Sequence, residues 1–382
     1  MTQVHARWLS GDVAGSVADL GVLLPLVSAL VLSGGFDAGT VLVGVGTLYV
    51  VSGLAFRVPV PVQPIKAAAA ITIARELPPA QLAVAGLILG LVLVALSLTG
   101  LAHRLAAVFT EPIVRGLQLG VGLILVRTSW RLAGPDPSGA VILCAVAVTA
   151  VLLVGTLRRL PLALPILVVG VAWSLAHTSV GGLELGLWQP RLAFGDLDAG
   201  LVWGAIGLLV IPQLPLTFGN AVVGVSKLEH EYYGPRARRV SEPRIALSCG
   251  LANIAVGVVG GMPMCHGSSG LTAHFRAGAQ TARMNLVIGV PLLAVGVIGG
   301  PAVLPLLALV PAAVLAGFLA FTGLLHAGLA WRLRGYSLAT AVTMAAVGFV
   351  TANLAWSLLT GLVLHWAPIG VRRLVLRPSP AA

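Results

Sequence analysis

Long apolar runs, separated by short clusters of charge, glycine or proline, fill almost the whole chain. A helix needs ~20 apolar residues to cross the hydrocarbon core of a bilayer, and most of the runs reach that length. The strict alternation of apolar and polar residues that barrel strands require is missing. The pattern therefore predicts an all-α membrane protein with fourteen segments. The expected spans are residues 14–33, 39–56, 61–74, 80–100, 106–127, 139–157, 161–177, 200–225, 244–260, 265–279, 284–300, 303–327, 337–353 and 354–368.

The third and tenth segments are too short to span a bilayer and contain residues that interrupt helices. The third includes "VPVPVQPIKAAAA", and the tenth includes "GMPMCHGSSG". Proline is tolerated in the first turn of a helix, so we expect residues 58–63 to be extended and a helix to start at Pro64. In the tenth segment we expect an extended stretch followed by a helix that Ser268 or Ser269 caps.

Composition supports a membrane protein. Of 382 residues, 58% are hydrophobic and 9% are charged, whereas soluble domains are about one quarter charged. The longest polar interval, Lys227 to Arg244, predicts an arginine-rich cytoplasmic loop, and no soluble domain is expected. The three cysteines have no CxxC spacing, which predicts neither a disulfide framework nor a metal site. Neither GxGxxG nor a phosphate-binding loop occurs, so no cofactor is expected.

The basic residues predict how the chain is oriented. With the N-terminus in the cytoplasm, 18 lysines and arginines fall inside and 4 fall outside. This bias has the sign expected for cytoplasmic loops, and it predicts a multi-pass protein of the cell (inner or plasma) membrane with both termini in the cytoplasm. The outside residues are Arg75, Arg127, Arg131 and Arg191, and Lys66 is left within the membrane.

The fourteen segments divide into two halves of seven. Residues 1–199 and 200–382 are the expected repeats, and an odd number of segments in each half gives the two repeats opposite orientations. The interrupted third segment then corresponds to the interrupted tenth. Short interrupted segments at matching positions of inverted repeats indicate the binding site of a secondary transporter.

Two half-helices that begin near the middle of the bilayer would direct unpaired backbone N–H groups and positive dipole ends at a common site, which favours an anion. Lys66 adds an ammonium in the first turn of one of them; the alternative is that its stem extends to the interface. Small residues at 67, 68, 267 and 270 allow a ligand to approach the backbone or allow helices to pack closely. The candidate substrate-binding residues are Gln63, Pro64, Lys66, Ala67, Gln213, Asn220, His266, Gly267, Ser268 and Ser269.

Several of these residues allow a second interpretation. Gln63, Gln213 and Asn220 can bind substrate oxygens or bond between helices. His266 can contact the ligand or be satisfied by backbone carbonyls. Asp19 can carry a coupling proton, pair with Lys66, or cap a helix, and Asp12 is expected to cap the first helix.

Five segments carry a resemblance to a known family: "GDVAGSVADLGVLLPLV", "FRVPVPVQPIKAAAA", "FGDL", "PQLPLTFGNAVVGVS" and "GGMPMCHGSSGLTAHFRAGA". They resemble the molybdate transporter family of the sulfate permease superfamily, in a prokaryotic form that ends without the cytoplasmic STAS domain. The resemblance implies a seven-plus-seven fold with core and gate subdomains, molybdate uptake, and pairing of two copies through gate domains. It also implies that Gln63, Pro64, Lys66, Gln213, Asn220 and residues 266–270 border the substrate.

The sequence thus predicts a secondary transporter that imports a tetrahedral oxyanion by alternating access, and not an enzyme. Molybdate is the first substrate to expect, with sulfate and tungstate next. A nucleobase permease of the same fold is an alternative, although the eighth segment offers Gln213 and Asn220 where a carboxylate would be expected. A membrane serine hydrolase using Ser268 or Ser269 with His266 is a third interpretation, but "HGSSG" is not GxSxG and no carboxylate orients the histidine.

Overall fold

The computed structural model describes residues 11–101, 104, 108–134, 138–157, 162–178, 184–192 and 198–375. The "FGDL" segment at 194–197 lies outside them. Residues 11–16 are helical, and a turn at 17–19 leads into the next helix. The remaining elements up to residue 177 are α2 (Leu20–Gly34), α3 (Ala38–Phe56), β1 (Gln63–Pro64), α4 (Lys66–Arg75), α5 (Pro79–Thr99), α7 (Glu111–Leu132), α8 (Gly139–Leu157) and α9 (Ala163–His177).

The second part of the chain begins with a continuous helical stretch that contains two π-helical segments. Its elements are α10 (Ala199–Gly204), η1 (Ala205–Val210), α11 (Ile211–Leu216), η2 (Thr217–Val223), α12 (Gly224–Tyr233) and η3 (Gly234–Arg239). The elements that follow are α13 (Glu242–Val258), β2 (Met264–Cys265), α14 (Ser268–Arg276), α15 (Arg283–Gly299), η4 (Gly300–Ala302), α16 (Val303–Ala308), α17 (Ala312–Gly328), η5 (Leu329–Arg332), α18 (Gly335–Thr351) and α19 (Leu354–Val375).

The protein is an all-α polytopic membrane protein. Within the described residues, five helices are long and apolar enough to cross a membrane, and five shorter helices are also apolar. The only strands described there are the two-residue β1 and β2. The third and tenth segments are broken as expected, because each contains a short extended stretch followed by a helix of ten residues or fewer.

Several predicted boundaries are wrong. The expected helix 14–33 is interrupted by the turn at 17–19, and the expected last helix 354–368 continues to Val375 in α19. The expected helix 303–327 is divided into α16 and α17, because the chain cannot continue as a helix through Pro311, which becomes the residue before α17. The expected helix 106–127 is α7, which starts at Glu111 and runs to Leu132. The polar interval after residue 226 is not a loop at first, because α12 continues to Tyr233.

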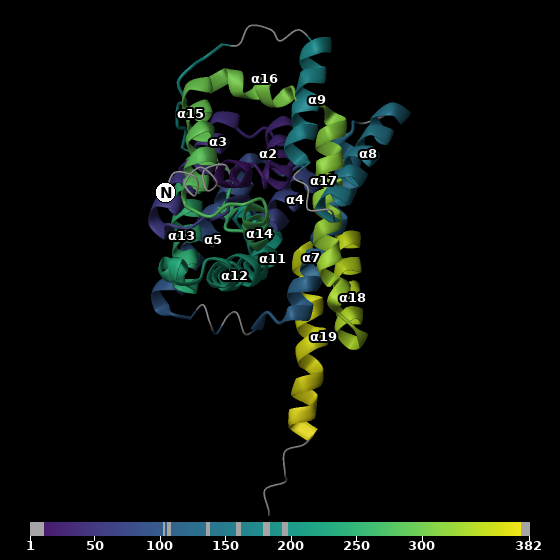
Figure 1. Ribbon diagram of the computed structural model, residues 1–382. Coiled ribbons are helices and arrows are strands. Elements are labelled where there is room, and N and C mark those ends of the chain that lie inside the picture. The colour runs from purple at the N-terminus through teal and green to yellow at the C-terminus, as the bar shows by residue number, and fades with distance from the viewer. Residues whose placement is uncertain are drawn as a thin grey trace, which may run out of the picture.

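The helices form two groups (Figure 1). The first bundle contains residues 11–34, α3, α4, α5 and the elements from α10 to α16; in it α5 packs along α13 and α3 packs along α15. The second bundle contains α7, α8, α9, α17, α18 and α19, with α7 packed against α17 and α18. The two bundles meet mainly where α2 contacts α17 and where α4 contacts α7.

Glycines allow the closest of these approaches. A Cβ at Gly90 of α5 would lie 2.7 Å from the carbonyl oxygen of Gly250 in α13. A Cβ at Gly122 of α7 would lie 2.5 Å from that of Gly323 in α17. Contacts this short exclude any side chain, so the helix backbones touch at these points as they do at small-residue interfaces in membranes.

Candidate functional site

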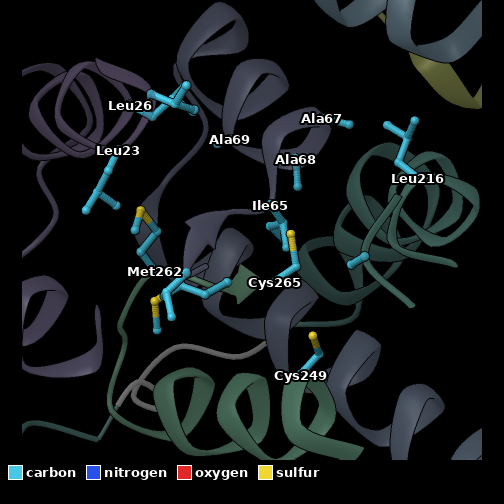
Figure 2. Close-up of a cluster of buried hydrophobic side chains, with 14 of the residues drawn as sticks. Leu23, Leu26, Ile65, Ala67, Ala68, Ala69, Leu216, Cys249, Met262 and Cys265 are labelled. Carbon is cyan, nitrogen blue, oxygen red and sulfur yellow. The ribbon is translucent and has the colours of Figure 1, made fainter. Parts of the chain in front are cut away.

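The strand pair β1–β2 holds the beginnings of the two half-helices together. The strands are antiparallel, with Gln63 opposite Cys265 and Pro64 opposite Met264. Because α4 starts two residues after Pro64 and α14 starts three residues after Cys265, their N-terminal ends lie on either side of this pair. Apolar side chains surround it: Figure 2 shows Ile65 beside Cys265, with the alanines of α4 between Leu26 and Leu216.

Pro64 is part of β1, so the prediction that it begins the helix is wrong. The helix begins at Lys66, with Ile65 in an extended conformation before it. The N–H of Ile65 donates to the Pro263 carbonyl oxygen at 3.1 Å, which continues the strand pairing past the proline. Proline cannot donate to the ladder, and Met264, its neighbour across the ladder, directs its own N–H to the Asn253 side chain at 2.7 Å.

Lys66 is buried between the two half-helices, with 5% of its surface exposed. Its Nζ donates to Gln63 Oε1 at 2.6 Å and to Ser269 Oγ at 3.1 Å. The ammonium therefore joins the start of α4 to the first turn of α14. The alternative in which the side chain extends to the membrane interface is wrong, because the charged end is bonded inside the protein.

Asp19 lies in the turn before α2 and is buried. Both of its carboxylate oxygens accept hydrogen bonds from Gln63 Nε2, the first at 2.6 Å. Asp19 stands at the N-cap position of α2, but its side chain accepts no hydrogen bond from that helix. Among the described ion pairs it has none with Lys66, so the alternatives of a side-chain cap and of a direct pair with Lys66 are not formed. The Gln63 amide instead stands between the two charges, with its oxygen toward the ammonium and its nitrogen toward the carboxylate.

Asp12 does not cap the first helix. It accepts hydrogen bonds from the backbone N–H groups of Gln280 at 2.7 Å and Thr281 at 2.9 Å, and from the Thr281 hydroxyl. It therefore holds the helix at residues 11–16 to the loop after α14.

Gln213 is brought to the same place from α11. Its Oε1 accepts from the backbone N–H groups of Ala67 at 3.0 Å and Ala68 at 3.2 Å, and its Nε2 donates to Thr217 Oγ1 at 3.0 Å. Two donors in the first turn of α4 are thus occupied by a side chain of the second half of the chain. The π-helical stretches η1 and η2 flank α11, and such stretches occur frequently at functional sites.

The first turn of α14 is the accessible part of the site. Its helix starts at Ser268, as predicted, but the residue before it is Gly267 and no side chain caps it, so capping by Ser268 or Ser269 is wrong. Ser268 is half-buried and donates its hydroxyl hydrogen to Asn220 Oδ1, whereas Ser269 is exposed. Within the described part of the chain, the backbone N–H groups of residues 268–270 have no acceptor.

Two glycines make room for the polar groups. A Cβ at Gly267 would lie 1.9 Å from Gln63 Oε1, and one at Gly270 would lie 2.7 Å from Asp19 Oδ2. Since real Cβ atoms do not approach other heavy atoms so closely, any side chain at either position would displace the Gln63 amide or the Asp19 carboxylate.

His266 is satisfied inside the protein. Its Nδ1 lies 2.8 Å from the Pro61 carbonyl oxygen and its Nε2 lies 3.0 Å from Ser248 Oγ, and the side chain is fully buried. His266 lies next to the site, but both of its ring nitrogens bond other protein groups, Pro61 and Ser248. Because neither ring nitrogen reaches Ser268 or Ser269, the serine–histidine arrangement considered for a hydrolase is not formed by these residues.

Sequence reasoning missed Asn253 and Asn285, which position β2 and the chain before β1. Asn285 accepts from the Val60 N–H at 2.9 Å and donates to the Val60 carbonyl at 2.7 Å. The signal that could have found them is the one that identified Gln213 and Asn220, an amide side chain within an apolar segment. The described residues contain no cluster of three His, Cys, Asp or Glu side chains able to hold a metal ion.

Comparisons with known proteins identify the family of the chain. A family described as "Molybdate transporter of MFS superfamily" matches residues 11–125 and 205–325. Molybdate transporter 2 of Arabidopsis thaliana is 29% identical over 83% of this chain and 78% of its own length. Molybdate transporter 1 of Chlamydomonas reinhardtii is 28% identical over 95% of this chain and 91% of its own.

Solved structures share the fold. The transmembrane domain of the cyanobacterial bicarbonate transporter BicA superposes with a TM-score of 0.67 at 18% identity, covering 92% of this chain and 97% of that domain. The murine Solute Carrier 26 family member A9 anion transporter, in its inward-facing state, gives a TM-score of 0.69 at 14% identity, covering 95% of this chain and 68% of the other.

Proposed function

Because this chain belongs to the molybdate transporter family, we propose that it imports molybdate, a tetrahedral oxyanion, across the cell membrane by alternating access. The anion binds between the N-terminal ends of α4 and α14, and both chain termini lie in the cytoplasm. The protein works as a transporter and not as an enzyme, in line with relatives named as transporters.

The observation that carries the proposal is the buried ammonium of Lys66 beside the first turn of α14. A lysine held within a membrane protein costs ~2.5–3.5 kcal/mol on insertion scales, so its presence indicates a use. Next to it, the N–H groups of residues 268–270 and the exposed Ser269 hydroxyl supply donors at the positive end of a helix dipole. Together they suit an oxyanion, which accepts hydrogen bonds and carries negative charge.

The remaining candidates support this site in different ways. Asn220 holds the Ser268 hydroxyl, and Gln213 holds the first turn of α4, with Ala67 as its backbone partner. When an anion binds the Lys66 ammonium, the hydrogen bond from Lys66 Nζ to Gln63 Oε1 must weaken or break. Asp19, at the other end of the Gln63 amide, is our candidate for a coupling proton, because neutralising a carboxylate so close would favour the entry of a dianion.

In the proposed mechanism the two bundles move relative to each other. Contacts come in matching pairs: α5 with α13 corresponds to α15 with α3, and α18 with α7 corresponds to α8 with α17. This correspondence supports an inverted repeat in residues 1–199 and 200–382. In such folds one bundle moves against the other around a site near the middle of the membrane.

Other tetrahedral dianions have nearly the same shape and hydrogen-bonding demands as molybdate, so tungstate and sulfate are the substrates to compete against it. A nucleobase is a poorer fit, because the groups facing the site from the eighth segment are amides rather than a carboxylate.

The test is uptake of radiolabelled molybdate by the purified protein in proteoliposomes, with tungstate, sulfate, bicarbonate and uracil as competitors. We expect saturable uptake that tungstate inhibits and uracil does not. Repeating it with an imposed pH gradient tests the coupling proton. Protein-free vesicles and vesicles with Lys66→Ala are the controls. No uptake above the empty vesicles by the folded protein would refute the proposal.

A further inference from the structure

Two arginines join the two bundles. Arg75, the last residue of α4, donates from Nε to the Ala352 carbonyl oxygen at 2.8 Å and from Nη2 to the Thr351 carbonyl oxygen at 2.7 Å. Arg131, in the last turn of α7, donates from Nη1 to the Ala74 carbonyl oxygen at 2.8 Å. Arg75 thus donates from the first bundle to the second, and Arg131 donates from the second bundle to the first.

Each guanidinium sits at the C-terminal end of a helix in the opposite bundle. Arg75 is at the end of α18, and Arg131 is at the end of α4. The last carbonyls of a helix have no partners within it and carry the negative end of its dipole, so a cation there is favoured. Both helices end in a non-glycine residue in the left-handed conformation, Ala352 at φ 48° and Glu76 at φ 53°.

These contacts are nearly the whole polar connection between the bundles. Among the described residues, the only other side-chain hydrogen bond from one bundle to the other joins Thr322 Oγ1 to the Gly21 carbonyl oxygen at 3.4 Å. A longer ion pair of 3.6 Å between Arg131 and Glu76 accompanies the arginine contacts. The hydrogen-bond acceptors of both arginines are backbone carbonyls, so these hydrogen bonds depend on how close the helix ends are.

We propose that Arg75 and Arg131 form an outer latch, which closes the extracellular side of the transport path in this conformation and opens before an anion enters from outside. The inference rests on the proposed function, because alternating access requires the bundles to separate on that side. Both arginines belong to the four basic residues that the charge distribution assigns to the outside. A hydrogen bond is lost beyond about 3.5 Å, so a small separation breaks the latch.

The accessibility of both latch arginines at the protein surface suits a contact that must open repeatedly. Arg75 is exposed, and the Arg131 side chain is about half exposed. Exposed charge contacts bias an equilibrium rather than lock it. The latch therefore sets the proportion of outward-open protein without preventing turnover.

The test measures access to Ser269 from outside, without any transported anion. Ser269→Cys is placed in a Cys144→Ser background, since Cys144 is the exposed cysteine, and a membrane-impermeant thiol reagent is added to intact cells. We expect Arg75→Ala and Arg131→Ala each to raise the labelling rate about two- to fivefold, the range of an exposed charge at a helix end. The Cys144→Ser parent gives the background from the buried cysteines.

Arg127→Ala is the matched control. It removes the same charge from α7, but Arg127 lies over the ring of Phe349 in α18, which belongs to the same bundle. Its labelling rate should equal that of the parent. Arg75→Lys should also label faster than the parent, because the compact ammonium lacks the rigid planar fork with which the guanidinium donates from Nε and Nη2 at once. Arg131→Lys, which needs to reach one carbonyl, should restore slow labelling.

The outer latch is refuted if both alanine variants label at the rate of Arg127→Ala while their amount in the membrane and their melting temperatures match the parent. It is equally refuted if Arg127→Ala labels as fast as they do, since any loss of charge would then suffice. If an alanine variant does not reach the membrane in normal amount, the labelling rates of Arg75→Lys and Arg131→Lys are compared with that of the parent instead. Failure of molybdate uptake in the parent would overturn the proposed function, but the labelling rates would still decide the latch.

Discussion

Replacing Gly267 by alanine should disrupt the site by displacing one side chain, that of Gln63. Gly267 has φ −94° and ψ 125°, which any residue adopts, so the substitution introduces no backbone strain. Its new methyl group, however, would lie 1.9 Å from Gln63 Oε1 and 2.8 Å from Gln63 Cδ. The Gln63 amide must move, and it is bonded at both ends inside the protein.

The magnitude follows from the bonds that Gln63 would give up. It accepts from Lys66 at 2.6 Å and donates to Asp19 at 2.6 Å, and both partners carry charge when ionised. Each hydrogen bond to a charged group contributes ~1.5–3 kcal/mol, so losing two costs roughly 3–6 kcal/mol of folding free energy. We expect the apparent melting temperature of Gly267→Ala in detergent to fall by roughly 4–8 °C.

A double-mutant cycle with Gln63→Ala identifies the cause. Without the glutamine the methyl group has room, so adding Gly267→Ala to Gln63→Ala should cost less than about 1 kcal/mol, and the two effects should be strongly non-additive. Melting temperature and molybdate uptake are measured for all four proteins. Additive effects, or a Gly267→Ala protein with unchanged melting temperature and uptake, would refute this account of the site.

Three further predictions use the same two measurements. Lys66→Ala should reduce molybdate uptake by about 10- to 100-fold at subsaturating concentration, the equivalent of one lost charge-assisted contact, and normal uptake would remove Lys66 from the site. Gln213→Ala should lower stability by about 0.5–2 kcal/mol, as the loss of a helix cap does, and an unchanged melting temperature would show that α4 does not need this cap. His266→Ala should lower the melting temperature because two buried hydrogen bonds disappear, yet leave the KM for molybdate within about twofold; a large rise in KM would place the imidazole against the anion.

The all-α polytopic class could be predicted from the sequence, because the hydrocarbon of a bilayer imposes helical structure on each apolar run separately. Runs of about 20 apolar residues must be helical to satisfy their own backbone, whatever surrounds them. Prolines and glycines near Gln63 and Gly267 likewise forbid a continuous helix there. For this reason each half-helix could be predicted from its own segment, and so could the placement of Lys66 within the membrane.

What each polar side chain contacts was decided by the tertiary structure alone. Gln213 reaches the N–H groups of Ala67 and Ala68 across 145 residues or more of sequence, and Asp12 reaches Thr281 across 269. The local pattern had left Gln213 open between a substrate ligand and a bond between helices, and it had suggested a helix cap for Asp12. A buried donor or acceptor bonds to whichever group packing brings within about 3 Å. That group lies in a distant part of the chain, and the local sequence does not indicate which part it is.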